Sequence, residues 1–368
     1  MRKGWEYKRW KEVLTIINGK NQSAVVDENG EYPIYGSGGI MGYANNWLCP
    51  ENCVIIGRKG NINKPIFVET KFWNVDTAFG LNANKEYLLP KFLYYFCLDY
   101  NFERHNKAVT IPSLTKADLL KIDIPLPPLS TQLAIVSELD KINELIRLKK
   151  EQLKDFDNLA QSLFYEMFGD PVENEKGWEV KKIGDLALVK TGPFGSMLHK
   201  EDYICDGIPL VNPVHMKDFK IVPDLDFTIS KEKASELKNY LLKSNDVVFA
   251  RRGDIGRCAI VSETEQGFIC GTGSLFVRFS KEIESIFIMY IIRCDSFSKH
   301  LISKAKGATM LNINSNTIAD LRIPLPPLSL QRLFAQRIEQ IEREKSEVQK
   351  SIQDLETLLA SRMQYWFE

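Results

Sequence analysis

Two long segments of the chain carry apolar residues at alternating spacings of four and three. This is the heptad pattern of a helix that packs along another helix. The pattern predicts one helix over about residues 131–168 and a second over about residues 330–367, neither of which contains Gly or Pro. The obvious partner of each helix is the other, so the two helices are expected to pack together as a coiled coil.

The expected contact seam can be read off both segments. In the first it consists of Ile135, Leu139, Ile142, Ile146, Lys149, Leu153, Phe156, Ala160, Leu163 and Met167. In the second it consists of Phe334, Ile338, Ile341, Lys345, Val348, Ile352, Leu355, Leu359, Arg362 and Trp366. The lysine near the middle of each seam would weaken packing but help to fix the register. The alternative is that its stem lies along the seam while its ammonium group reaches solvent.

The same seven residues, Ile-Pro-Leu-Pro-Pro-Leu-Ser, introduce both helices, at 124–130 and again at 323–329. Each Pro fixes φ and disfavours helix in the residue before it, so this Pro motif is expected to be extended. Ser130 and Ser329 stand where the N-caps of the two helices are expected.

The rest of the chain forms two modules of mixed α/β pattern. Gly-Trp-Glu opens both modules, at 4–6 and 177–179, and an apolar strand pattern in each leads to a cationic turn, at 58–62 and 251–255. We therefore predict a mixed α/β fold of two globular domains joined by two long coiled-coil helices, with an internal two-fold repeat. The expected boundaries are globule 1–123, Pro motif plus helix 124–170, globule 171–322 and Pro motif plus helix 323–368.

Composition and charge narrow the function. Of 368 residues, 44% are hydrophobic and 26% are charged, which predicts real cores rather than disorder. Without a long apolar run or a signal-peptide pattern, the chain is expected to be soluble and cytoplasmic. The formal net charge is zero, whereas a lone non-specific DNA binder is usually strongly basic. Any DNA-binding surface should therefore be local, with part of the affinity coming from a partner.

Catalytic and metal-binding motifs are not recognisable in the sequence. There is no P-loop, and the glycines within residues 35–43 do not form G-x-G-x-x-G. Asn212-Pro-Val-His215 lacks the second Pro and the aromatic residue of the adenine methyltransferase motif. Cys49 and Cys53 have no second cysteine pair or nearby His, which favours reduced thiols over zinc. We expect a non-catalytic chain that binds no metal.

The residues best suited to DNA are cations that follow a strand and stand next to a glycine. Paired cations on such a turn suit phosphate oxygens. The alternative is a surface turn whose charges are merely solvated. The phosphate-binding candidates are Arg58, Lys59, Arg251, Arg252 and Arg257.

Taken together, these features closely resemble the specificity (S) subunit of type I restriction-modification enzymes, over essentially the whole chain. The resemblance is carried by the two Pro motifs with their helices, Arg251–Gly256, Thr191–Ser196 and the glycine-rich segment Tyr35–Tyr43. It implies that each globule is a target-recognition domain for one half of a bipartite, asymmetric DNA site, and that the two long helices pack antiparallel as a spacer. It also implies two methyltransferase subunits that use S-adenosylmethionine and a motor-nuclease subunit that uses ATP and Mg, all cofactors lying outside this chain.

The internal repeat adds a hypothesis about base recognition. If the two globules recognise different half-sites, residues that they share should serve structure or phosphate positioning. Base-reading residues should then lie where the copies differ. In the first globule the candidates are Ser37, Tyr43, Asn45 and Asn46, and in the second they are Asn212, His215 and Lys217.

The sequence leaves three other functions open. The chain is compatible with the specificity subunit of a related restriction or phage-defence methyltransferase system that has different partner enzymes. A self-contained DNA methyltransferase or nuclease would need a cofactor or metal motif that is not found. A coiled-coil scaffold that binds only proteins would retain no DNA when assembled with a methyltransferase subunit.

Overall fold

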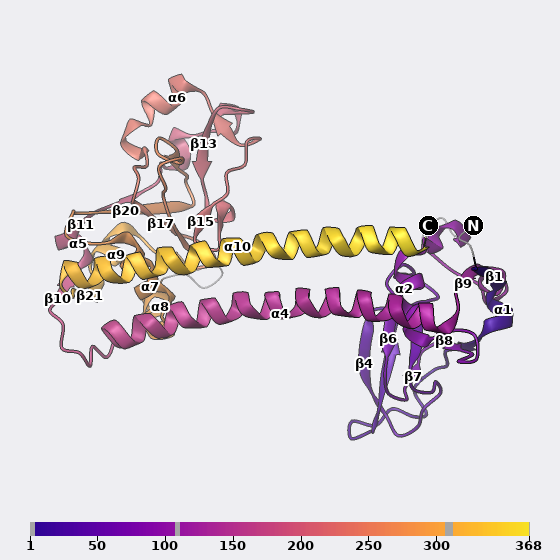
Figure 1. The fold of residues 1–368 in the computed structure, drawn as a ribbon. Coiled ribbons are helices and arrows are strands. Elements are labelled where there is room, and N and C mark those ends of the chain that lie inside the picture. The colour runs from indigo at the N-terminus through magenta and orange to yellow at the C-terminus, as the bar shows by residue number, and fades with distance from the viewer. Residues whose placement is uncertain (1–3, 107–110, 306–311, 368) are drawn as a thin grey trace. The chain divides into compact units, whose positions relative to one another are not determined.

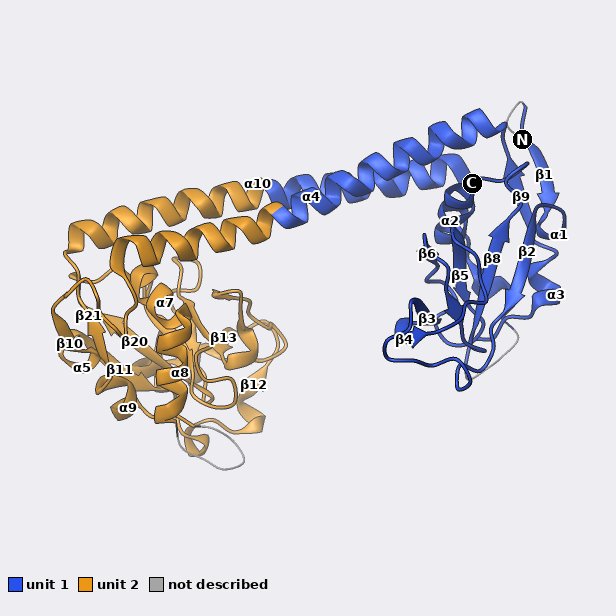
Figure 2. Cartoon of the chain, turned by 90° about the horizontal axis from the view of Figure 1, so that it is seen from below, with its two compact units in different colours: residues 1–151, 348–368 blue, residues 152–347 orange. Residues whose placement is uncertain are grey.

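The computed structural model describes residues 4–106, 111–305 and 312–367. The chain divides into two compact units, unit 1 (residues 1–151 and 348–368) and unit 2 (residues 152–347), which are blue and orange in Figure 2. The division falls inside both long helices, α4 (Leu129–Phe168) and α10 (Leu328–Phe367). Each unit therefore combines one globule with part of each helix, whereas the predicted domains assign each helix to a segment of its own.

Unit 1 is built on a four-stranded antiparallel sheet in the order β2-β8-β5-β6. A three-stranded sheet, β4-β3-β7, and the pair β1-β9 complete its strands. The strands are β1 (Glu6–Arg9), β2 (Leu14–Asn18), β3 (Tyr32–Gly36), β4 (Gly39–Ala44), β5 (Cys53–Gly57), β6 (Ile66–Val68), β7 (Trp73–Asn74), β8 (Ala78–Ala83) and β9 (Asp123–Leu126). The helices beside α4 and α10 are α1 (Trp10–Val13), α2 (Pro90–Asp99) and α3 (Lys116–Leu119).

The central strands of unit 1 form where the apolar pattern predicts them. All five residues of β5 are buried, as expected for a continuous apolar run that is covered on both faces. In β2, Leu14 and Ile16 are buried and Thr15 is exposed, which is the alternation of a half-buried strand. Helix α2 packs on this sheet and closes the core of unit 1.

Unit 2 repeats this plan and adds to it. Its main sheet has the order β11-β20-β17-β18, a second sheet has the order β12-β16-β13-β19, and β14-β15 and β10-β21 are pairs. The strands are β10 (Val180–Lys182), β11 (Ala187–Thr191), β12 (Tyr203–Ile204), β13 (Ile208–Val211), β14 (Met216–Lys217), β15 (Lys220–Ile221), β16 (Thr228–Ile229), β17 (Val247–Ala250), β18 (Cys258–Ile260), β19 (Ile269–Cys270), β20 (Ser274–Phe279) and β21 (Arg322–Pro324). The helices are α5 (Ile183–Leu186), α6 (Lys231–Glu236), α7 (Ser285–Arg293), α8 (Asp295–Lys304) and α9 (Ser315–Ala319).

The two main sheets correspond strand by strand. β2, β8, β5 and β6 of unit 1 take the same order as β11, β20, β17 and β18 of unit 2, and each pairing is antiparallel. The internal repeat expected from the sequence is therefore present in the fold. Unit 2 also contains strand β12, the pair β14-β15 and helix α6, all before β17, and α6 and β15 are labelled in Figure 1.

The Pro motif is extended, as predicted. Its first copy enters strand β9, which pairs antiparallel with β1 so that Ile124 lies opposite Lys8. Its second copy enters β21, where Ile323 lies opposite Lys181 of β10. Each Pro motif therefore closes its globule by pairing with the strand that opens it.

The expected N-caps are wrong by two residues. Helices α4 and α10 begin at Leu129 and Leu328, so Ser130 and Ser329 lie inside the first turn. The carbonyl of Pro128 instead accepts hydrogen bonds from the backbone N–H groups of Thr131 and Gln132, at 2.8 and 3.0 Å. The carbonyl of Pro327 accepts from Leu330 and Gln331 in the same way, at 2.9 and 3.2 Å. An N-cap residue is the one whose carbonyl accepts the first helical bond, so the last Pro of each motif takes that position.

Within unit 1 the helices are antiparallel. Glu138 near the start of α4 pairs with Arg362 near the end of α10, while Lys150 further along α4 pairs with Glu356, at 2.7 Å. Trp366 donates its indole N–H to Glu138 at 3.1 Å, and its ring stacks on Trp5 with centroids 6.3 Å apart. The Trp that opens this globule thus packs on the C-terminal turns of α10.

Unit 2 has the same antiparallel arrangement. Asp157 of α4 pairs with Lys345 of α10 at 2.8 Å, and Lys345 also pairs with Glu342 at 3.1 Å. The seam lysine of α10 is thus tied to the facing helix by an ion pair rather than only reaching solvent. Trp178 donates its indole N–H to the carbonyl of Phe168 at 2.9 Å and so packs on the end of α4. Every residue of the two predicted seams is buried or half-buried.

Candidate nucleic-acid interface

The cationic turn of unit 1 follows directly from the buried strand β5. The N–H of Arg58 donates to Thr77 O at 2.8 Å, and the carbonyl of Arg58 accepts from Leu114 N at 2.9 Å. Lys59 forms an isolated β-bridge with Ser113. Gly60 then turns the chain with φ of 79°, a conformation that side chains other than glycine rarely adopt. Two backbone segments therefore hold this turn in place.

The turn of unit 2 is held by the same backbone contacts. Arg251 donates its N–H to Gly273 O at 2.9 Å, and its carbonyl accepts from Ile313 N at 2.9 Å. Arg252 bridges to Asn312, and Gly253 turns the chain with φ of 76°. The two turns thus occupy equivalent positions in their units and make the same backbone contacts. Each contains the glycine that we expected to turn the chain.

The charges on these turns are available to a ligand to different degrees. Arg58, Lys59 and Arg252 are exposed, and Arg251 is half-buried. Burial and, to a smaller extent, the neighbouring Arg252 lower the pKa of the Arg251 guanidinium. Its buried Nε has no hydrogen-bond partner among the described residues. Two adjacent guanidinium groups repel each other, so an anion placed between them would relieve an unfavourable interaction.

Arg257 is engaged within the turn itself. Its Nε and Nη2 donate to Asp254 Oδ2 at 3.0 and 2.8 Å, and its Nη1 donates to Pro213 O at 3.2 Å. A phosphate at this position would compete with the Asp254 carboxylate. Arg257 therefore ties the turn to the segment that contains Asn212 and His215.

In unit 1, the glycine-rich segment forms a hairpin of β3 and β4 rather than a loop. Its turn lies against the cationic turn: a Cβ at Gly60 would stand 4.0 Å from Ser37 Oγ. Tyr43, on β4, is 47% exposed, and Asn45 and Asn46 follow the strand as exposed residues. Ser37 is thus brought to the cations, while Tyr43 and the asparagines extend along the same hairpin.

In unit 2, the three base-reading candidates are placed very differently. Asn212 Oδ1 accepts from Gly273 N at 3.1 Å, which fixes it beside the Arg251 turn. His215 is only 7% exposed, and its Nδ1 lies 2.7 Å from Leu210 O. Lys217 is exposed at the end of β14. The side chains of Asn212 and His215 thus form hydrogen bonds with nearby backbone groups.

Two residues that sequence reasoning missed are Gln132 and Gln331, both 0% exposed. Gln132 accepts from the N–H of Leu89 at 2.9 Å and donates to the carbonyl oxygens of Tyr87 and Pro127 at 2.8 and 3.0 Å. It therefore ties the residue that precedes α2 to the Pro motif.

Gln331 makes the matching contacts in unit 2. It accepts from Glu284 N at 3.1 Å, just before α7, and donates to Pro326 O at 2.8 Å. The sequence did hold a signal for this joint, because the second residue after the Ser of each Pro motif is Gln in both copies.

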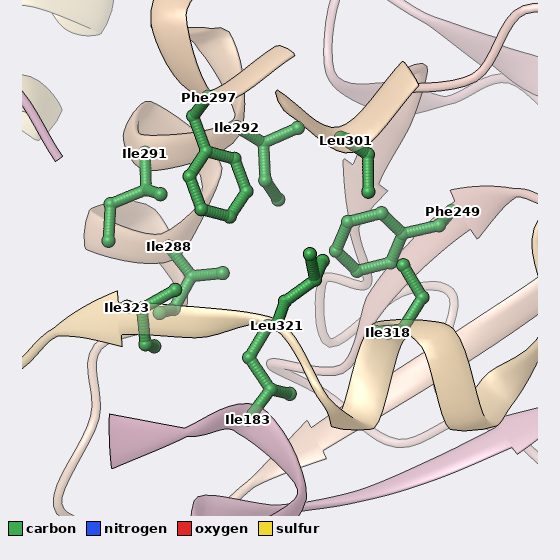
Figure 3. A pocket seen from close by; sticks show the side chains of 10 residues that line it. All are labelled: Ile183, Phe249, Ile288, Ile291, Ile292, Phe297, Leu301, Ile318, Leu321 and Ile323. Carbon is green, nitrogen blue, oxygen red and sulfur yellow. The ribbon is translucent and has the colours of Figure 1, made fainter. Parts of the chain in front are cut away.

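Two cavities among the described residues differ in size and lining. One in the core of unit 2 measures about 10 Å³ and is lined only by apolar side chains, with Phe297, Leu321 and Phe249 among those that point into it (Figure 3). A hollow of about 430 Å³ in unit 1 lies beside the Lys91–Asp140 ion pair, with Tyr35 and Tyr94 in its wall. In the ranges that the structure describes, no group of three or more His, Cys, Asp and Glu side chains is placed to hold a metal ion.

Comparison with known proteins agrees with this arrangement. The model of the type I restriction modification DNA specificity domain matches residues 2–155 and 175–357. The MjaVIII specificity subunit of a type I restriction enzyme from Methanocaldococcus jannaschii is 23% identical, with 96% of this chain and 92% of that protein covered. The EcoBI specificity subunit from Escherichia coli is 21% identical, with 88% and 73% covered.

Solved structures show a similar fold. A chain from a study of complex assembly and conformational transition of the type I R-M system gives a TM-score of 0.65 at 18% identity, covering 99% of this chain and 97% of that one. The S subunit of the type I restriction-modification system of M. genitalium gives a TM-score of 0.59 at 15% identity, with 99% and 96% covered. Among the described helices, none has the length and apolar character needed to cross a membrane.

Proposed function

The chain belongs to the family of type I restriction modification DNA specificity domains, and on this basis we propose how each part of the chain contributes to DNA recognition. Its role is that of the DNA-recognition subunit of a type I restriction-modification complex. Each globule recognises one half of a bipartite, asymmetric site. The observation that carries this division is the pair of cationic turns, which are held by the same backbone contacts in both units while the surrounding loops differ.

The turns are proposed to grip phosphates. Arg58 and Lys59 in unit 1 and Arg251 and Arg252 in unit 2 are fixed at the backbone and carry donors for anionic oxygens. Phosphate contacts position a protein on DNA without reading its sequence, which fits residues that both copies share. Arg257 contributes mainly by holding the turn, because Asp254 already accepts its hydrogen bonds.

Base recognition is assigned to side chains that differ between the units. In unit 1 we retain Ser37, which lies beside the cationic turn, and Tyr43, Asn45 and Asn46, which are exposed on or just after β4. In unit 2 we retain Lys217 as an exposed candidate. Asn212 and His215 are reassigned to the support of the Arg251 turn, because both are engaged by backbone atoms.

The long helices are proposed to set the half-site separation and to dock methyltransferase subunits. Each is 40 residues long, which corresponds to about 60 Å at about 1.5 Å per residue. That length exceeds the roughly 34–36 Å of one DNA turn. Leu145 and Leu148 of α4 and Leu358 of α10 are each at least 46% exposed within unit 1, which supports a protein-binding surface there.

The chemistry is assigned to the partners. Methyltransferase subunits, two for one copy of this chain, would supply S-adenosylmethionine-dependent methylation of adenine. Motor-nuclease subunits would supply ATP hydrolysis and Mg-dependent cleavage. The present chain would contribute recognition and no catalytic residue.

An Arg251→Ala variant tests the assignment of the turns. In the complex with methyltransferase subunits, it should weaken binding to all duplexes roughly tenfold and reduce the slope of log K against log salt by about one. The preferred site should not change. Arg322→Ala, which removes an exposed arginine on β21, serves as the control. A relaxed preference at one base pair with an unchanged salt slope would show that Arg251 reads a base instead.

A further inference from the structure

The segment Thr191–Ser196 contributes to the family resemblance, yet none of the roles proposed for unit 2 involves it. Gly192 and Pro193 are buried, Phe194 is 60% exposed, and Leu198 is buried again at 6%. The loop is therefore anchored at both ends and holds a large aromatic side chain in solvent between them. An aromatic ring held in this way offers a large apolar contact area to a ligand.

The anchor at Gly192 is tight. Its N–H donates to Ser274 O at 2.9 Å, and a Cβ at this position would stand 1.9 Å from Gly271 O. Only glycine permits this approach of two backbones. Pro193 then fixes φ, so the position of Phe194 is largely set before any ligand arrives.

This loop leaves the sheet beside the Arg251 turn. Strand β11 ends with Thr191 opposite Leu275, and β17 ends with Ala250 opposite Ser274, so both strands end at the beginning of β20. Phe194 and the cations proposed to contact phosphate thus lie at the same end of the sheet.

A second exposed apolar residue belongs to the same region. Val214 is 65% exposed and follows Pro213, whose carbonyl is bound by Arg257. The neighbouring Asn212 holds Gly273 N at 3.1 Å. The loops of Phe194 and Val214 therefore both rest on the short segment 271–273.

Unit 1 shows which part of the loop is shared. Its equivalent loop follows β2, where a Cβ at Gly19 would stand 1.7 Å from Val75 O and Gly19 N donates to Ala78 O at 3.2 Å. The position that matches Phe194 is Asn21, an exposed polar residue. The anchor is common to both units and the tip differs, as expected for a base-reading loop on a shared frame.

We propose that Phe194, assisted by Val214, reads the half-site of unit 2 by apolar contact with the C5-methyl group of a thymine. In the major groove this methyl group is the apolar feature that distinguishes one base from the others, and a phenylalanine side chain complements it. The proposed phosphate contacts of Arg251 and Arg252 place the Phe194 loop at the major groove. This inference rests on the proposed function, in which unit 2 recognises one half-site.

The test uses the complex of this chain with its methyltransferase subunits and a randomised duplex library. Phe194→Ala should reduce discrimination about tenfold at one or two adjacent positions of one half-site that contain thymine, and leave the other half-site and the salt slope unchanged. Replacing that thymine by deoxyuridine should weaken wild-type binding by a similar factor and have little effect on the variant. Leu188→Ala, which truncates a 54% exposed residue on β11, the strand that leads into the Phe194 loop, is the matched control.

Each outcome decides the proposal. Unchanged preferences for Phe194→Ala, loss at a position without thymine, or an equal deoxyuridine effect in both proteins would overturn it. Reduced assembly with the methyltransferase, without altered base preference, would overturn it in favour of a protein contact. If the wild-type complex showed no sequence preference at all, the proposed function itself would fail, and this result is distinguishable from the others.

Discussion

Replacement of the buried glutamine at each joint gives the sharpest test of how the globules are fixed to the spacer helices. Gln132→Leu keeps the approximate volume but removes three hydrogen bonds to backbone groups. Leu89 N–H loses its acceptor, which costs about 1–3 kcal/mol for a buried group, and the two carbonyl oxygens each lose about 0.5–1.5 kcal/mol. The free energy of unfolding should therefore fall by about 2–6 kcal/mol. This is a large share of the roughly 5–15 kcal/mol typical of a folded protein.

The same change in unit 2 should be slightly milder. Gln331→Leu removes two hydrogen bonds, to Glu284 N and Pro326 O, so about 2–4 kcal/mol is expected. Gln353→Leu in unit 1 and Gln340→Leu in unit 2 are matched controls at exposed positions of α10, where changes stay within about 0.5 kcal/mol.

Urea denaturation followed by tryptophan fluorescence measures the global cost, and amide hydrogen exchange locates it. Exchange should accelerate at Leu89 in Gln132→Leu and at Glu284 in Gln331→Leu, because each amide loses its acceptor. If the joint variants were no less stable than their controls, or if protection at these two amides were unchanged, the joint would not depend on the glutamines.

Three further predictions follow from other contacts. Asp246→Asn should lower the free energy of unfolding by about 3 kcal/mol in urea denaturation, because Asp246 is 1% exposed and binds Arg278 at 2.8 and 2.6 Å; a loss below about 1 kcal/mol would contradict this. Arg362 lowers the pKa of Glu138, so this pair should stabilise unit 1 above pH about 4.5 and lose its effect as the pH falls through the lowered pKa. Since both side chains are about one third exposed, the effect is at most about 1 kcal/mol, and Glu138→Gln should flatten the acid limb of the stability profile. Inserting enough residues after α4 to add one full helical turn should lengthen the non-specific gap of the methylation site. Altered half-site sequences would refute the spacer role.

The sequence was sufficient for the elements whose periodicity is strong. The seam of α4 and α10, the strands β5 and β17, and the extended Pro motif all follow from local pattern, because burial of one face requires that pattern wherever the partner lies. Thr115 also caps α3, accepting from Asp118 N at 3.2 Å, and Thr-x-x-Asp is a local capping signal. The repeat of the main features in the same order further predicted that the two globules share one plan.

Contacts between distant segments could not be predicted in this way. Helices α4 and α10 begin directly after Pro128 and Pro327, whose carbonyls accept the first helical hydrogen bonds, and the strand pairing of each Pro motif with the start of its globule lies just upstream. His215 carried the right chemistry for base recognition, but its ring is turned toward Leu210, which only the packing of β13 determines. Likewise, the ion pair of Asp246 with Arg278 joins residues whose proximity depends on the neighbouring strands β17 and β20.

If the two globules recognise the two halves of one interrupted DNA site, the host genome should carry the corresponding methylation pattern. Methylome sequencing of the host, with and without the gene for this chain, is the decisive experiment. We expect a motif of two specific halves separated by a non-specific gap, methylated on adenine only when the gene is present. An uninterrupted motif, or methylation that does not depend on the gene, would contradict it.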